Sequence, residues 1–115
     1  MRDAAFKTYF SDFQKRVYQT AVELGWYADP KLPFNDGEKI ALMHSELSEA
    51  LDWLRQGNPP SDHIPEFSGA EEELADTVIR IMGYAQHKGL DVAGAVVAKA
   101  AYNDARPYKH GGKLF

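Results

Sequence analysis

The chain has 115 residues, of which 44% are hydrophobic and 26% are charged, a composition typical of one soluble globular domain. Its net charge of −4 argues against binding polymeric nucleic acid, which proteins hold by neutralising phosphates with lysine and arginine. The absence of cysteine excludes disulfides, thiolate metal sites and a cysteine nucleophile. No apolar run approaches the roughly 20 residues that cross a bilayer, and residues 1–6 lack a signal-peptide pattern, so we expect a cytoplasmic protein with no membrane partner.

Hydrophobic periodicity predicts four helices and no strand. The first covers residues 3–24, and Gly25 ends it. Its apolar residues recur every three or four positions and form one expected core stripe: Phe6, Phe10, Phe13, Val17, Ala21 and Leu24. After a loop with two prolines, Asn35 or Asp36 caps a second helix over residues 37–56. Its expected core stripe consists of Ile40, Met43, Leu47, Ala50, Leu51 and Leu54.

The second half of the chain continues the helical pattern. After a loop over residues 57–67, Ser68 and Glu71 have the spacing of a capping box that begins a third helix. This helix extends to Lys88, and Gly89 ends it. Its expected core residues are Leu74, Val78, Ile81, Met82 and Ala85. Asp91 caps a fourth helix over residues 92–105, which Pro107 closes.

These elements predict an all-α fold, a compact four-helix bundle that forms a single domain over residues 1–115. We expect its tail, residues 107–115, to be partly mobile. The fourth helix is rich in alanine and valine, which favours close helix packing and a subunit interface.

Two acidic repeats lie in the second and third helices: Glu46-Leu-Ser-Glu49 and Glu73-Leu-Ala-Asp76. Residues three apart share a helical face, so four carboxylates converge if the two helices pack together. Burying unpaired carboxylates is costly unless a cation joins them, and the usual cation for an all-oxygen cluster is a hard divalent ion. The repeats predict a metal site between these helices. A single pair of this kind is also typical of a solvated helix face.

Other metal and phosphate sites are excluded by spacing. A di-iron carboxylate site needs Glu-x-x-His pairs, and no glutamate stands three residues before any histidine of this chain. Neither a His-Glu-x-x-His zinc motif nor a glycine-rich phosphate loop is present. We therefore expect Mg²⁺, with Mn²⁺ as a possible substitute.

The acidic repeats and the C-terminal segment resemble the MazG-like nucleotide pyrophosphohydrolases of the all-α NTP pyrophosphatase superfamily. The resemblance extends from Gly37 onward and is carried by residues 43–51 (MHSELSEAL), 72–80 (EELADTVIR) and 102–112 (YNDARPYKHGG). It implies that Glu46, Glu49, Glu73 and Asp76 bind Mg²⁺. It also implies hydrolysis of a nucleoside triphosphate to the monophosphate and pyrophosphate, as in nucleotide-pool housecleaning, by a homodimer or a dimer of dimers.

The chemistry that this resemblance implies assigns roles to further residues. A carboxylate that is not fully engaged with metal accepts the proton of the attacking water, and Glu49 and Glu46 are the catalytic candidates. Residues 99–115 carry a charge of +3, so the rest of the chain sums to −7. Lys99 and Asn103 share a helical face. Together with Arg106 and Lys109, they are the candidate phosphate-binding residues, although cations at a helix C-terminus also serve solubility.

Three residues are candidates for contact with the base: Trp53, His44 and Tyr108. Trp26 and Tyr84 offer similar chemistry, and a tryptophan beside an apolar stripe is more often part of the core. Two alternatives to an enzyme remain: a nucleotide-binding module without turnover and a structural helical oligomerisation module.

Overall fold

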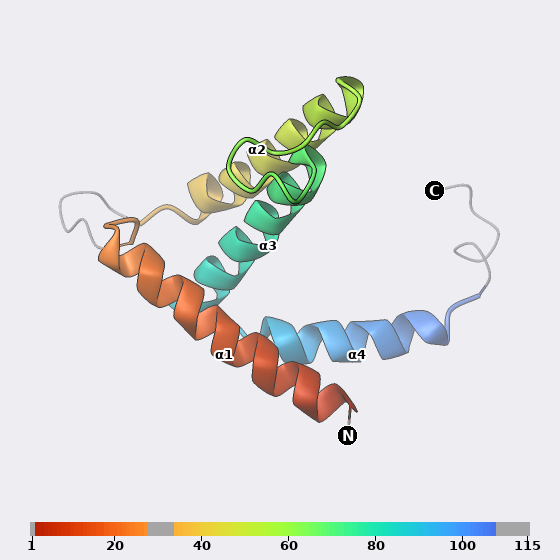
Figure 1. The fold of residues 1–115 in the computed structure, drawn as a ribbon. Helices are drawn as coiled ribbons and strands as arrows, with labels where there is room; N and C mark the ends of the chain where they lie inside the picture. The colour runs from red at the N-terminus through yellow and green to blue at the C-terminus, as the bar shows by residue number, and fades with distance from the viewer. Residues whose placement is uncertain (1, 28–33, 108–115) are drawn as a thin grey trace.

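The computed structural model describes residues 2–27 and 34–107. These residues form four α-helices: α1 (Arg2–Glu23), α2 (Asp36–Arg55), α3 (Gly69–Lys88) and α4 (Val92–Asp104) (Figure 1). No strand occurs in this part of the chain, where Pro60 and Ser68 form an isolated antiparallel bridge. The all-α prediction is confirmed, with the helix ends within one residue of those expected. None of the described helices is both long and apolar enough to cross a bilayer.

The predicted capping residues account for these boundaries. Asn35 accepts a hydrogen bond from the backbone of Glu38 at the start of α2, and Ser68 and Glu71 form the reciprocal capping box of α3. Gly89 ends α3 with a φ of 70°, a left-handed conformation that glycine adopts without steric cost. Local chemistry therefore determines where α2 and α3 begin and where α3 ends.

The four helices do not form a closed bundle. Helix α2 lies beside α3, α1 packs against α3, and α4 packs against the N-terminal part of α1 (Figure 1). From there α4 extends away from the α2–α3 pair. The radius of gyration is 16.8 Å, whereas about 13 Å is typical of a compact domain of this length. The expected compact four-helix bundle is therefore wrong for a single chain, because α4 meets α1 near its own start and then extends outward without packing on the α2–α3 pair.

The expected core stripes are confirmed in part: Ala50, Met82 and Ala85 are buried, whereas about half of the stripe residues are exposed in a single chain. Leu47 and Leu51 of α2 are 45% and 48% exposed, and Leu74 of α3 is 51% exposed. Further members of the predicted stripes are exposed as well: Phe6, Phe13, Leu24, Ile40, Leu54 and Val78. The buried residues of the three packed helices are mostly small or polar: Gln14, Glu46, Ala50, Gly69, Ala70, Glu73, Thr77, Met82, Gly83 and Ala85. Small residues let α2 and α3 approach closely, and Leu47, Leu51 and Leu74 stay exposed.

Candidate active site

The two acidic repeats meet between α2 and α3. Carboxylate oxygens of Glu46, Glu49 and Glu73 lie within 4.8 Å of one another, and so do those of Glu72, Glu73 and Asp76. Glu73 belongs to both trios. The predicted convergence of Glu46, Glu49, Glu73 and Asp76, here called the acidic cluster, thus appears as two overlapping groups.

Members of the acidic cluster differ in their exposure to solvent. Glu46 is 8% exposed and Glu73 is 6% exposed, whereas Asp76 is half-buried and Glu49 is exposed. Carboxylates are rarely buried without a partner, because leaving water costs free energy. The two buried members, Glu46 and Glu73, therefore require compensating charge, whereas Glu49 is open to solvent.

Glu73 is the member of the acidic cluster whose pKa is strongly raised. Burial, then a hydrogen bond with Glu49 and the negative charge of Glu49, raise its pKa to about 7; the indole of Trp53 acts in the opposite direction. Without a cation, Glu73 therefore keeps its proton up to near neutral pH. The buried position of Glu73 beside Glu49 thus disfavours its negative charge.

Trp53 supports Glu73 from α2. Its indole N–H donates a hydrogen bond to Glu73 Oε2 over 3.3 Å. The ring also lies directly against Gly69, where an added Cβ would fall 2.3 Å from Trp53 Cδ2. The indole N–H of Trp53, a candidate for contact with the base, is therefore already bonded to Glu73. Gly69, at the start of α3, leaves room for the indole ring.

Arg80 is the cation that sequence reasoning left without a role. It lies one turn after Asp76 on α3, and its Nε donates to Glu46 Oε1 over 2.9 Å. The spacing of Glu73, Asp76 and Arg80 places all three on one helical face. This spacing is the sequence feature that could have indicated that Arg80 belongs to the site. Arg80 compensates the buried charge of Glu46.

Glu72 is a second residue that the sequence did not single out, and it anchors the loop before α3. Ser61 donates a hydrogen bond to its Oε1, and His63 Nδ1 lies 3.0 Å from its Oε2. These two contacts lower the pKa of Glu72, and the carboxylate raises the pKa of His63. Because both oxygens of Glu72 are occupied, the trio of Glu46, Glu49 and Glu73 suits a metal better.

The donor set fits a hard divalent cation. The cluster offers only carboxylate oxygens, which Mg²⁺ and Mn²⁺ prefer over softer ligands. Burial first, and then the neighbouring Glu49, raise the pKa of Glu73, and a bound dication would favour its charged form. Glu46, Glu49, Glu73 and Asp76 are the residues that would hold it.

A cavity of about 310 Å³ opens beside the cluster, within the range that holds small-molecule ligands. It lies between the C-terminal part of α1, the turn after it, α2 and α3. Two of its lining residues, Glu46 and Asp76, are members of the acidic cluster. The other lining residues are apolar, aromatic, small or cationic: Val17, Thr20, Ala21, Leu24, Trp26, Tyr27, Lys39, Ile79, Arg80 and Gly83. The acidic cluster and the cavity are thus continuous.

No family model, curated protein or solved structure matches this chain. The resemblance to MazG-like enzymes therefore depends on the sequence motifs alone. The functional assignment depends on the site itself.

The turn beside the cavity is fixed by Lys39 and an aromatic group. Lys39 Nζ donates to the backbone oxygen of Trp26 over 3.1 Å and lies 4.4 Å from the centroid of the Tyr27 ring. His87 stacks on Tyr27 and Phe34, with ring centroids 4.9 Å and 4.4 Å away. These contacts hold one wall of the cavity in place.

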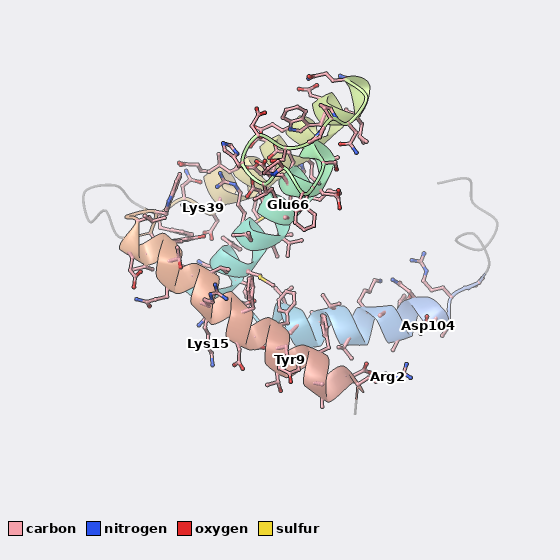
Figure 2. The ribbon with its side chains drawn as sticks, in the orientation of Figure 1. Arg2, Tyr9, Lys15, Lys39, Glu66 and Asp104 are labelled. Atoms are coloured by element: carbon pink, nitrogen blue, oxygen red, sulfur yellow. The ribbon has the colours of Figure 1, made fainter. Side chains whose placement is uncertain are left out.

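The predicted phosphate-binding residues lie elsewhere in the chain. Lys99 and Asn103 line a separate, shallow groove of about 410 Å³ on α4, and Arg106 follows the end of that helix. Figure 2 labels Lys39 at the cavity side of the molecule and Asp104 at the far end of α4. A single chain therefore does not bring Lys99 and Asn103 to the acidic cluster. Lys109 and Tyr108 lie outside the described residues.

The remaining base-contact candidates have different surroundings. His44 is exposed on α2 and is not part of the cavity lining. The hydroxyl of Tyr84 donates to Asp36 Oδ1 over 2.7 Å, which ties α3 to the start of α2. Trp26 lines the cavity and is 58% exposed, so it is the aromatic residue best placed to meet a ligand there.

Proposed function

We propose that this protein is a Mg²⁺-dependent nucleoside triphosphate pyrophosphohydrolase that converts an NTP or dNTP into the monophosphate and pyrophosphate, in cytoplasmic nucleotide-pool housecleaning. One observation carries the proposal: Glu46 and Asp76 belong to the acidic cluster and also line the cavity. A ligand in the cavity that extends toward these residues meets the metal-binding carboxylates. An aromatic wall beside such a cluster suits a nucleoside with a phosphate chain.

The residues of the site divide the chemical work. A bound Mg²⁺ would neutralise the triphosphate and lower the pKa of a bound water. Glu49 is the exposed carboxylate of the trio that it forms with Glu46 and Glu73. It accepts the proton as the water oxygen attacks the α-phosphorus. The bond from the α-phosphorus to the bridging oxygen breaks, and pyrophosphate leaves with that oxygen. Glu46 is the weaker candidate for the base because its Oε1 is paired with Arg80.

The test is a screen of ribo- and deoxyribonucleoside triphosphates with Mg²⁺, in which pyrophosphate and orthophosphate are measured separately. Pyrophosphate release that depends on Mg²⁺ supports the proposal. Release of orthophosphate alone, or no turnover of any triphosphate, contradicts it.

We also propose that a second copy of the chain, in a homodimer or a dimer of dimers, completes the triphosphate site. Apolar residues of α2 and α3 are exposed in a single chain, among them Leu47, Leu51 and Leu74. Ala93 is the buried residue of α4. Exposed apolar residues of this kind typically mark interfaces. Pairing of two chains would cover these residues and can bring α4 of one chain, with Lys99 and Asn103, to the acidic cluster of the other.

Replacing Lys99 by Ala tests this shared site. We expect triphosphate to bind about tenfold more weakly, because a charge-assisted contact to phosphate is lost. Mixing Lys99→Ala with Glu49→Gln chains should restore about a quarter of wild-type turnover, because half of the dimers are mixed and each mixed dimer has one intact site. Steady-state kinetics of the mixture and light scattering measure the outcome. A monomer, or a mixture no more active than its components, contradicts the shared site.

A further inference from the structure

We propose that Arg80 is a phosphate-binding residue that exchanges one partner for another. In the ligand-free chain its guanidinium neutralises Glu46. When a divalent cation takes over the charge of Glu46, the guanidinium turns to the phosphate chain of a nucleotide in the cavity. The ligand class rests on the proposed function, whereas the position of Arg80 rests on the geometry.

The position of Arg80 connects the cluster and the cavity. Its Nε donates to Glu46 Oε1 over 2.9 Å, and its side chain is 31% exposed. The residue also lines the cavity beside Asp76. Arg80 is thus within reach of the carboxylates that would hold a metal and of the space that would hold a ligand.

Arginine is suited to serve both partners. A guanidinium has five N–H donors in a planar fork that matches carboxylate and phosphate oxygens. The ion pair with Glu46 uses Nε. The two terminal nitrogens of the guanidinium move with it when the side chain rotates. A phosphate chain carries more negative charge than one carboxylate, so it is the stronger partner once a dication shares Glu46.

Lys39 does not substitute for Arg80 in this role. Among the described residues that line the cavity, Lys39 and Arg80 are the cationic side chains. The ammonium of Lys39 donates to the carbonyl of Trp26 and lies over the Tyr27 ring, so its contacts hold the cavity wall. Arg80 is the cation that faces the acidic cluster.

This exchange has a consequence for the order of binding. Without a dication, a triphosphate that enters the cavity meets uncompensated carboxylates and an arginine already paired with one of them. With the dication bound, both the repulsion and the competition for Arg80 decrease. We therefore expect metal binding to strengthen phosphate binding, and the reverse, since coupling between two ligands is reciprocal.

Arg80→Ala separates this role from a purely structural one. We expect the variant to bind Mn²⁺ alone about threefold to tenfold more tightly, because a positive charge beside the metal ligands is removed. It should bind a triphosphate analogue with an α,β-methylene bridge, in Mg²⁺, about 10 to 100 times more weakly, because charge-assisted contacts are lost. Isothermal titration calorimetry measures both affinities. Arg55→Ala is the matched control, since Arg55 is an exposed arginine of α2 paired with exposed Asp52, and neither affinity should change.

The outcomes distinguish the two proposals. Unchanged or weaker Mn²⁺ binding, or unchanged analogue binding, in Arg80→Ala overturns the exchange, even if the wild-type protein hydrolyses triphosphates. If no triphosphate is hydrolysed but the two affinities change in opposite directions, the exchange stands and the proposed function fails. Should Arg80→Ala not fold, Arg80→Lys keeps the charge and loses the planar fork. It should bind the analogue several-fold more weakly, and wild-type analogue binding would overturn the proposal.

Discussion

Glu49→Gln is expected to lower kcat by about a hundredfold or more while the fold stays intact, because electrostatic and metal-assisted stabilisation supplies several kcal/mol in sites of this kind. Glu49 is exposed, so little stability depends on it. The amide keeps the size of the side chain but removes the charge that would hold the metal and the base that would accept the proton. Binding of the nucleoside part should change less than turnover, because Trp26 and the apolar lining are untouched.

The measurement is pyrophosphate release by Glu49→Gln under saturating Mg²⁺ and substrate, alongside a thermal melt of the same sample. Glu38→Gln is the matched control, because Glu38 is an exposed glutamate in the first turn of the same helix and lies outside the acidic cluster. The control should retain wild-type turnover. Near-wild-type pyrophosphate release by Glu49→Gln would remove Glu49 from the catalytic machinery.

Features set by local chemistry were predictable from the sequence. Ser68 and Glu71 form the expected capping box, and Gly89 ends α3 as expected, because caps depend on a few neighbouring residues. The acidic repeats were equally readable, since a three-residue spacing fixes a common helical face. Helix boundaries and the common face of each carboxylate pair therefore followed from short-range patterns, whereas the meeting of the two pairs depends on the packing of α2 against α3.

Features set by packing between helices were not predictable in the same way. Leu47 and Ala50 of α2 both belong to the apolar stripe, and only the approach of α3 decides that Ala50 faces its own chain. An apolar stripe indicates which residues avoid water. It does not indicate whether they are buried against helices of the same chain or against a second copy of the chain. The direction of α4, and with it the separation of Lys99 from the acidic cluster, depends on the same long-range packing.

Arg80 was missed for a related reason. An arginine on a helix is most often a solvated charge, and its spacing from Asp76 becomes informative only when a buried carboxylate of another helix faces it. The contact with Glu46 joins residues 34 positions apart in the chain. Such pairings depend on the tertiary structure, and periodicity within one helix does not reveal them.

Glu73→Gln is expected to change stability and activity in opposite directions. In the folded protein the pKa of Glu73 is raised to about 7 from an ordinary value of 4.5. The folded state therefore binds more protons than the unfolded state between these values, and this contribution to stability is lost as the pH rises through 7. Glutamine is neutral at every pH and its amide oxygen can still accept the indole N–H of Trp53. Without metal at pH 8, the variant should be more stable by about 1 kcal/mol, or roughly 4 °C in Tm.

The same substitution should abolish the response to metal. A dication would replace the proton of Glu73, so Mg²⁺ should stabilise the wild-type protein more at pH 8 than at pH 5.5. Saturating Mg²⁺ at 100 times its Kd adds about 2.7 kcal/mol; Glu73→Gln should lose most of this gain and about a hundredfold in turnover. Thermal melts across pH, with and without Mg²⁺, measure both effects. A variant that melts below the wild type at pH 8 without metal, or that keeps the full Mg²⁺ shift, would show that Glu73 is a structural residue and not a metal ligand.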